Sequence, residues 1–145
     1  MNFGWSVSDI LAISQLAAKV YTTYKDAPSD YKHIAEEVDS LRVMINKAAR
    51  HFQSTTLSNS DRQDGQKVLK GSQSILEDLD SLLEKYKSLA STRRHSVFQR
   101  VMLGTEDITQ LRDRLTSNAT SLSSFIRRFD IPSHYYLAIM LMSLP

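Results

Sequence analysis

The segment between residues 31 and 52, YKHIAEEVDSLRVMINKAARHF, decides the fold class of this chain. Apolar residues recur in it every three or four positions, and the charged residues fall between them. This spacing matches the period of an α-helix with one apolar face. The apolar positions are Tyr31, Ile34, Val38, Leu41, Ile45, Ala48 and Phe52. The segment therefore predicts a one-sided amphipathic helix.

Three other segments carry similar helical spacing, at residues 6–25, 60–89 and 106–129. Each begins at residues that favour helix N-caps, and Pro28 separates the first segment from the one just described. Because the loops between the segments are short, we predict an all-α fold, an up-and-down four-helix bundle over residues 1–130. Neighbouring helices in such a bundle pack nearly antiparallel, at about 20°.

Additional features are expected around the third and fourth helices. Gly65 and Gly71 are expected to let the early turns of the third helix fray or bend, because each glycine costs about 1 kcal/mol in a helix interior. A short helix is predicted over residues 97–102, before Gly104 ends it.

The composition of the 145-residue chain agrees with a compact helical domain. The chain is 41% hydrophobic and 23% charged. Its 4 Gly and 3 Pro are too few for the many turns of a β-sandwich or for a disordered linker. The absence of cysteine excludes a disulfide framework, a thiolate zinc site and a cysteine nucleophile. The net charge of +2 gives no strong attraction to nucleic acid, so no nucleic-acid partner is predicted.

The first helix is the most informative feature for function. Its apolar residues, together with two aromatic residues just before it, could insert into a membrane interface or assemble with other copies. These residues are Phe3, Trp5, Val7, Ile10, Leu11, Ile13, Leu16 and Val20. The alternative is that this helix is the central helix of the bundle, with Trp5 closing one end, and the two interpretations can describe different states.

The sequence also suggests two further contact surfaces, a basic patch and an apolar C-terminal segment. Arg93, Arg94 and Arg100 form a basic patch that could meet anionic lipid headgroups, or they lie on an exposed loop. Residues 131–145 are predicted to form a short apolar C-terminal helix that leads to a further region of a longer protein. Its candidate partner contacts are Tyr135, Tyr136, Ile139 and Met140.

No catalytic, cofactor-binding or metal-binding constellation is expected. The histidines His33, His51, His95 and His134 lack the spacing of metal ligands. No serine lies in a G-x-S-x-G elbow, and no glycines form a phosphate-binding loop. The acidic cluster at residues 77–84 is predicted to be a solvated helix face. The prediction is a protein that is not an enzyme and has no cofactor.

The opening of the chain resembles a known family. Phe3-Gly4-Trp5-Ser6-Val7-Ser8-Asp9-Ile10, the continuation Leu16-Ala17-Ala18-Lys19-Val20-Tyr21 and the segment at residues 31–41 resemble the HeLo-like N-terminal domains of fungal signalling proteins. Such domains usually precede a nucleotide-binding oligomerisation module in receptors of the STAND or NLR-like type. They are similar in architecture to the four-helix bundle of the animal necroptosis executor.

The resemblance implies a mechanism of clustering, release of the N-terminal helix and membrane permeabilisation, which kills the cell in heterokaryon incompatibility or defence. The expected location is the cytoplasm, because residues 1–7 lack the basic region of a signal peptide, with relocation to the plasma membrane on activation. The expected partners are other copies of the chain, membrane lipids and a downstream regulatory domain. The alternative function is a soluble helical adaptor that binds another protein and has no membrane activity.

Overall fold

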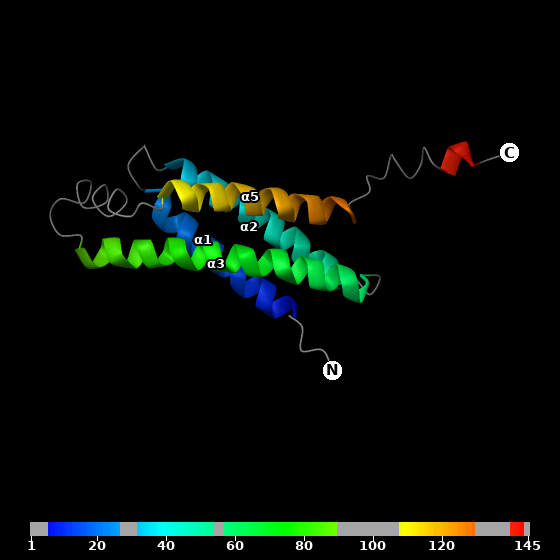
Figure 1. Cartoon of the computed structure of the whole chain (residues 1–145), viewed down its shortest axis with the longest axis horizontal. Coiled ribbons are helices and arrows are strands. Elements are labelled where there is room, and N and C mark those ends of the chain that lie inside the picture. The colour runs from blue at the N-terminus through cyan, green and yellow to red at the C-terminus, as the bar shows by residue number, and fades with distance from the viewer. Residues whose placement is uncertain (1–5, 27–31, 54–56, 90–107, 130–139, 144–145) are drawn as a thin grey trace.

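The computed structural model describes residues 6–26, 32–53, 57–89, 108–129 and 140–143. Four long helices account for most of them: α1 (Val7–Tyr24), α2 (Lys32–Gln53), α3 (Asn59–Leu89) and α5 (Ile108–Arg127) (Figure 1). The predicted all-α fold is therefore confirmed, and each helix lies within about two residues of its predicted bounds, the usual uncertainty of a helix end. The short helix predicted at residues 97–102 lies outside the described residues.

The arrangement of the helices differs from the predicted one. Helix directions alternate along the chain, but α2 and α3, which are consecutive, lie across a diagonal of the bundle and scarcely touch. Around the bundle the order is α1, α2, α5, α3. As a result α1 packs parallel to α3, and α2 packs parallel to α5 (Figure 1). The prediction that neighbours pack antiparallel holds for α1–α2 and α3–α5 and is wrong for the other two pairs.

All four helices contribute to one hydrophobic core. The apolar stripe predicted on α2 is its buried face, with Ile34, Val38, Leu41, Ile45 and Ala48 fully inaccessible to solvent. The largest side chains buried elsewhere in the core are Tyr24 and Ile10 of α1, Leu69, Leu76 and Leu79 of α3, and Phe125 of α5. Burial of apolar area at this scale is the main source of stability of such a bundle.

Gly65 has a packing role that the sequence did not predict. Helix α3 continues through Gly65 and Gly71, so the expected fraying of its early turns is wrong. A Cβ atom on Gly65 would lie 2.7 Å from the rings of both Phe52 and Phe125. The two rings pack edge to face, with centroids 6.2 Å apart. The glycine is therefore required by the close approach of these two rings to the backbone of α3.

Two serine–asparagine pairs join the antiparallel helices. Ser14 Oγ of α1 donates to Asn46 Oδ1 of α2 at 2.7 Å. Ser72 Oγ of α3 donates to Asn118 Oδ1 of α5 at 2.6 Å, and Asn118 Nδ2 donates to the Val68 carbonyl at 3.0 Å. Because a buried polar group is costly without its partner, each pair favours one register of its two helices.

Candidate functional site

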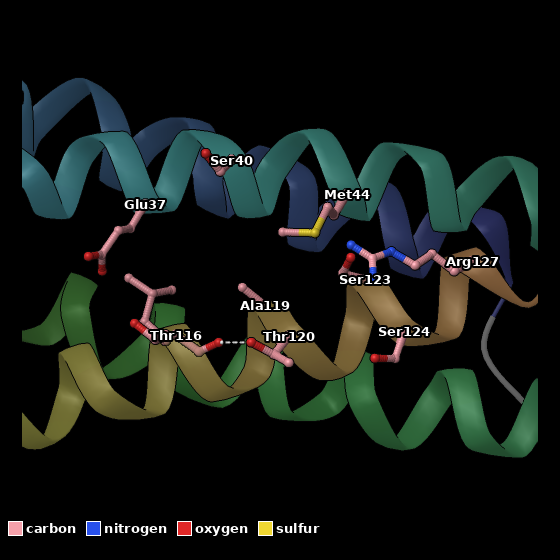
Figure 2. A pocket seen from close by; sticks show the side chains of 10 residues that line it. Glu37, Ser40, Met44, Thr116, Ala119, Thr120, Ser123, Ser124 and Arg127 are labelled. Carbon is pink, nitrogen blue, oxygen red and sulfur yellow. Dashed lines mark hydrogen bonds between the residues drawn. The ribbon is translucent and has the colours of Figure 1, made fainter. Parts of the chain in front are cut away.

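A groove of about 430 Å³ runs between the parallel helices α2 and α5. Figure 2 shows side chains of both helices facing it, with Met44 and Ala119 near its middle. Glu37 lies at one end and Arg127 at the other. The remaining lining is rich in hydroxyl groups and consists of Ser40, Leu115, Thr116, Thr120, Ser123 and Ser124.

The sequence analysis did not predict this groove. It depends on α2 and α5 being parallel neighbours, which periodicity within each helix does not reveal. One signal was present in the sequence: the α5 positions 116, 120, 123, 124 and 127 carry small or polar residues beside the apolar stripe. Small side chains on two adjacent helices leave a hollow between the helix axes.

Helix α1 begins at a well-defined N-terminus. The Ser6 backbone N–H donates to the Asp9 carboxylate at 2.7 Å, and the Ser6 carbonyl accepts from the Asp9 N–H at 3.1 Å. An acidic residue in the first turn also complements the helix dipole. Ser6 is therefore the N-cap of α1, directly before its first helical residue, Val7.

The candidate membrane residues of α1 divide into buried and exposed positions. Ile10, Ile13 and Val20 are buried in the core, and Val7 and Leu16 are partly buried against it. Leu11 points outward and is 44% exposed. Phe3 and Trp5 lie outside the described residues. In this state α1 is one of the four helices that form the core of the bundle.

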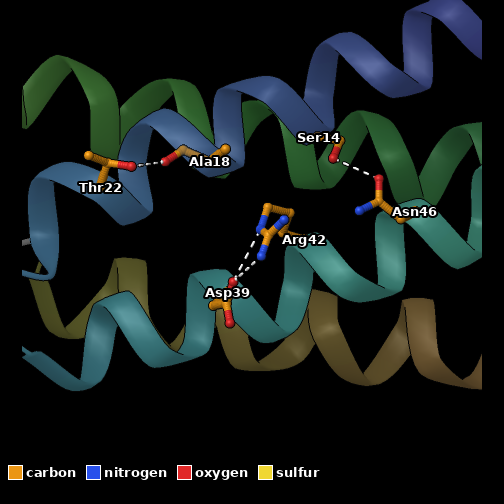
Figure 3. Close-up of polar contacts among 6 residues, drawn as sticks. All are labelled: Ser14, Ala18, Thr22, Asp39, Arg42 and Asn46. Carbon is orange, nitrogen blue, oxygen red and sulfur yellow. Dashed lines mark hydrogen bonds and ion pairs between the residues drawn. The ribbon is translucent and has the colours of Figure 1, made fainter.

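The seam between α1 and α2 is polar on its outer side (Figure 3). Besides Ser14–Asn46, Arg42 pairs with Asp39 of the same helix at 2.6 Å, and Thr22 Oγ1 donates to the Ala18 carbonyl at 2.9 Å. Of these contacts, only the Ser14–Asn46 hydrogen bond crosses between the two helices. The burial of apolar side chains such as Ile10, Val20 and Tyr24, rather than a network of polar bonds, therefore holds α1 in the bundle.

A second attachment links the C-terminal half of α1 to α3. Lys19 Nζ lies 3.2 Å from Asp80 Oδ1 and 3.8 Å from a Glu84 oxygen. Because Lys19 is half exposed, such an ion pair contributes only about 0–1 kcal/mol. The acidic cluster predicted as a solvated face thus supplies interhelical ion pairs, including Asp78 with Arg114 at 2.8 Å.

Tyr24 fixes the last turn of α1 in the core. Its side chain is fully inaccessible to solvent. Burial, with a smaller contribution from the nearby Asp80 charge, raises the pKa of the Tyr24 phenol above its ordinary value of 10.0. The phenol is therefore protonated in the folded chain at every physiological pH.

This pKa shift predicts an alkaline sensitivity. Above about pH 10 the unfolded chain ionises this phenol while the folded chain does not, so the free energy of unfolding falls by up to about 1.4 kcal/mol per pH unit from this group. The Tyr24→Phe variant is expected to lose stability less steeply with rising pH. Urea denaturation at neutral and alkaline pH measures this, and identical slopes for the variant and the parent would contradict the prediction.

The other candidate residues fall largely outside the described residues. Arg93, Arg94 and Arg100 of the basic patch do so, as do Tyr135, Tyr136 and Ile139. Met140 is described, in a helical turn at residues 140–142, and is 64% exposed. Leu141 and Met142 beside it are also exposed. The described part of the C-terminal segment thus exposes three apolar side chains.

Within the described part of the chain, no group of three or more His, Asp or Glu side chains is placed to hold a metal ion. No helix among the same residues combines the length and the apolar character that crossing a bilayer requires.

Comparison with known proteins adds no relative: no protein-family model, no curated protein and no solved structure matches this chain. The class of protein is thus defined by its fold, an all-α helical bundle.

Proposed function

We propose that this chain is a non-enzymatic, HeLo-like signalling domain that self-associates and, when clustered, releases α1 to permeabilise membranes and trigger cell death. The observation that carries the proposal is the character of α1. Its 18 residues include only two charged side chains, Asp9 and Lys19, and apolar Leu11 lies on its outer face. The likeness of residues 3–10 to the HeLo-like opening supports the same assignment.

The attachment of α1 explains why a single copy would stay closed. Release would expose Ile10, Ile13, Val20 and Tyr24, and each large apolar side chain costs about 1.5–3 kcal/mol to return to water. The Ser14–Asn46 hydrogen bond and the exposed ion pairs of Lys19 add little to this cost. A membrane interface that takes up the apolar residues offsets the larger cost. The domain would act in the cytoplasm and move to the plasma membrane on activation.

Leakage from lipid vesicles tests the proposal. The protein is clustered through an antibody against a terminal tag and mixed with dye-loaded phosphatidylcholine vesicles containing anionic phosphatidylserine. We expect leakage from the parent chain and a loss of about tenfold or more in the Leu11→Lys variant, because a charged residue in the inserted face is costly. Val43→Lys is the matched control, since Val43 of α2 is 45% exposed against 44% for Leu11.

The folded state of both variants is checked by thermal unfolding, which an exposed substitution should barely change. Equal leakage from the parent, Leu11→Lys and Val43→Lys chains would exclude insertion of α1.

A second candidate function is a helical adaptor without membrane activity. The exposed apolar turn at Met140, Leu141 and Met142 favours it, because such a surface is typical of a contact with a partner. Light scattering after size-exclusion chromatography compares the chain with and without residues 134–145. A vesicle-inert chain whose monomeric state is unaffected by this truncation would favour the adaptor over the signalling domain.

A further inference from the structure

The α2–α5 groove carries opposite charges at its two ends. Glu37 of α2 lies at the end near Thr116, and Arg127 lies in the last turn of α5 (Figure 2). Along α5, the rise from Thr116 to Arg127 is about 16 Å, at 1.5 Å per residue. The side chains between the two ends carry no charge.

Neither end charge is fully matched within the described part of the chain. One oxygen of Glu37, Oε1, is 3.7 Å from Arg112, and the other oxygen, Oε2, is buried and accepts no hydrogen bond there. Arg127 is exposed and forms no ion pair with the described residues. Arg127 can therefore take an acidic partner, and the Glu37 side chain, which is 32% exposed, can share a basic partner with Arg112.

The middle of the groove is uncharged. Met44 lies near its midpoint, opposite α5 residues that include Ala119 (Figure 2). Serine and threonine side chains make up most of the remaining lining between the two ends. An uncharged centre with charged residues toward the edge is common in protein interfaces.

We propose that this groove is the contact surface of a two-fold dimer of the chain, in which Glu37 of each copy pairs with Arg127 of the other. A two-fold axis through the middle of the groove reverses its direction in the second copy, so the acidic end of each copy meets the basic end of the other. The same axis brings Met44 of both copies to the centre. Each of the two ion pairs thus joins Glu37 of one copy to Arg127 of the other.

The self-complementary charges identify a second copy as the occupant. An unrelated partner would need a basic and an acidic group at matching positions, whereas a copy of this chain has both by symmetry. The inference deepens the proposed function, on which it rests, by naming the surface through which the domain self-associates. It requires no movement of α1, because the groove is formed by α2 and α5 alone.

Charge reversal tests the pairing. The dissociation constant of the dimer is measured by sedimentation equilibrium for the parent, Glu37→Arg, Arg127→Glu and the double variant. Each single reversal places like charges at both ends and is expected to weaken the dimer by about tenfold or more. The double variant restores opposite charges at both ends and is expected to dimerise within about threefold of the parent. A monomeric parent, or single variants that dimerise like the parent, would overturn the proposal.

Cysteine cross-linking provides an independent test, because the chain contains no cysteine. A Met44→Cys side chain would lie close to the two-fold axis and is expected to form a disulfide-linked dimer under mild oxidation. Leu11→Cys, on the exposed face of α1, is expected to stay monomeric in the absence of vesicles. Equal cross-linking of the two variants, or none in Met44→Cys, would contradict the proposed interface.

Membrane permeabilisation and dimerisation through the groove are tested independently of each other. Vesicle leakage is measured on chains clustered by antibody, so a chain that lacks the dimer can still leak. Dimerisation is measured without lipid, so a chain that does not leak can still dimerise.

Discussion

Replacing Phe125 with alanine is expected to lower the free energy of unfolding by about 3–5 kcal/mol, the usual cost of removing a buried aromatic side chain. The ring is 1% exposed and packs edge to face against Phe129, with centroids 5.1 Å apart, and against Phe52 at 6.2 Å. Arg128 lies over the same ring at 5.2 Å and forms ion pairs with Asp61 and Asp64. Urea denaturation measures the loss.

A glycine substitution shows whether this aromatic contact has the described geometry. Gly65→Ala places a Cβ 2.7 Å from both rings, so it is expected to cost about 1–3 kcal/mol by overpacking. In the Phe125→Ala chain only the contact with the Phe52 ring remains, so the same change is expected to cost less than in the parent, and the gain in helix propensity of up to about 1 kcal/mol offsets part of that cost. A Gly65→Ala change that stabilises both chains would contradict the close approach.

Gly71→Ala is the matched control in the same helix. A Cβ at this position meets only one side-chain atom, Asn118 Nδ2, at 2.9 Å. The gain in helix propensity and the displacement of the amide are expected to cancel within about 1 kcal/mol. A large destabilisation by both substitutions would indicate a general intolerance of alanine in α3 rather than a specific contact with the rings.

Locking α1 to α2 is expected to abolish vesicle leakage. In the double variant Ser14→Cys and Asn46→Cys the two thiols would replace side chains whose oxygens are 2.7 Å apart. A disulfide there prevents α1 from leaving the bundle, and the proposed mechanism requires that it leave. Leakage should fall to the vesicle background under oxidising conditions and return after reduction, since no other cysteine is present.

The corresponding lock between α3 and α5 is the control. Ser72→Cys with Asn118→Cys replaces a pair at 2.6 Å and leaves the α1 contacts unchanged. We expect this variant to leak like the parent in both redox states. Full leakage from the oxidised Ser14→Cys and Asn46→Cys chain, once the disulfide is verified by mass spectrometry, would contradict α1 release.

The helices could be predicted from the sequence because their signals are local. The spacing of Ile34, Val38 and Leu41 defines the buried face of α2 without reference to the rest of the chain. The order of the helices around the bundle is not local. The short connection from Gln53 to Asn59 permits both an adjacent and a diagonal position of α3, so periodicity could not distinguish them.

The same limit applies to the surfaces and to Gly65. The role of Gly65 depends on Phe52 and Phe125, which lie 13 and 60 residues away in the sequence, so its propensity alone predicted a weak point in the helix. The α2–α5 groove likewise exists only because those helices are parallel neighbours. In contrast, the outward position of Leu11 beside buried Ile10 follows from helix geometry within α1.

The diagonal placement of α2 and α3 divides the bundle into two hairpins. Residues 7–53 form one antiparallel pair and α3 with α5 the other, each with its own serine–asparagine bond, and the two associate through parallel contacts. Each hairpin is a candidate cooperative unit for native-state hydrogen exchange. Release of α1 would separate the α1–α2 pair and leave the α3–α5 pair intact. The activated form proposed above would therefore still contain one folded helical hairpin.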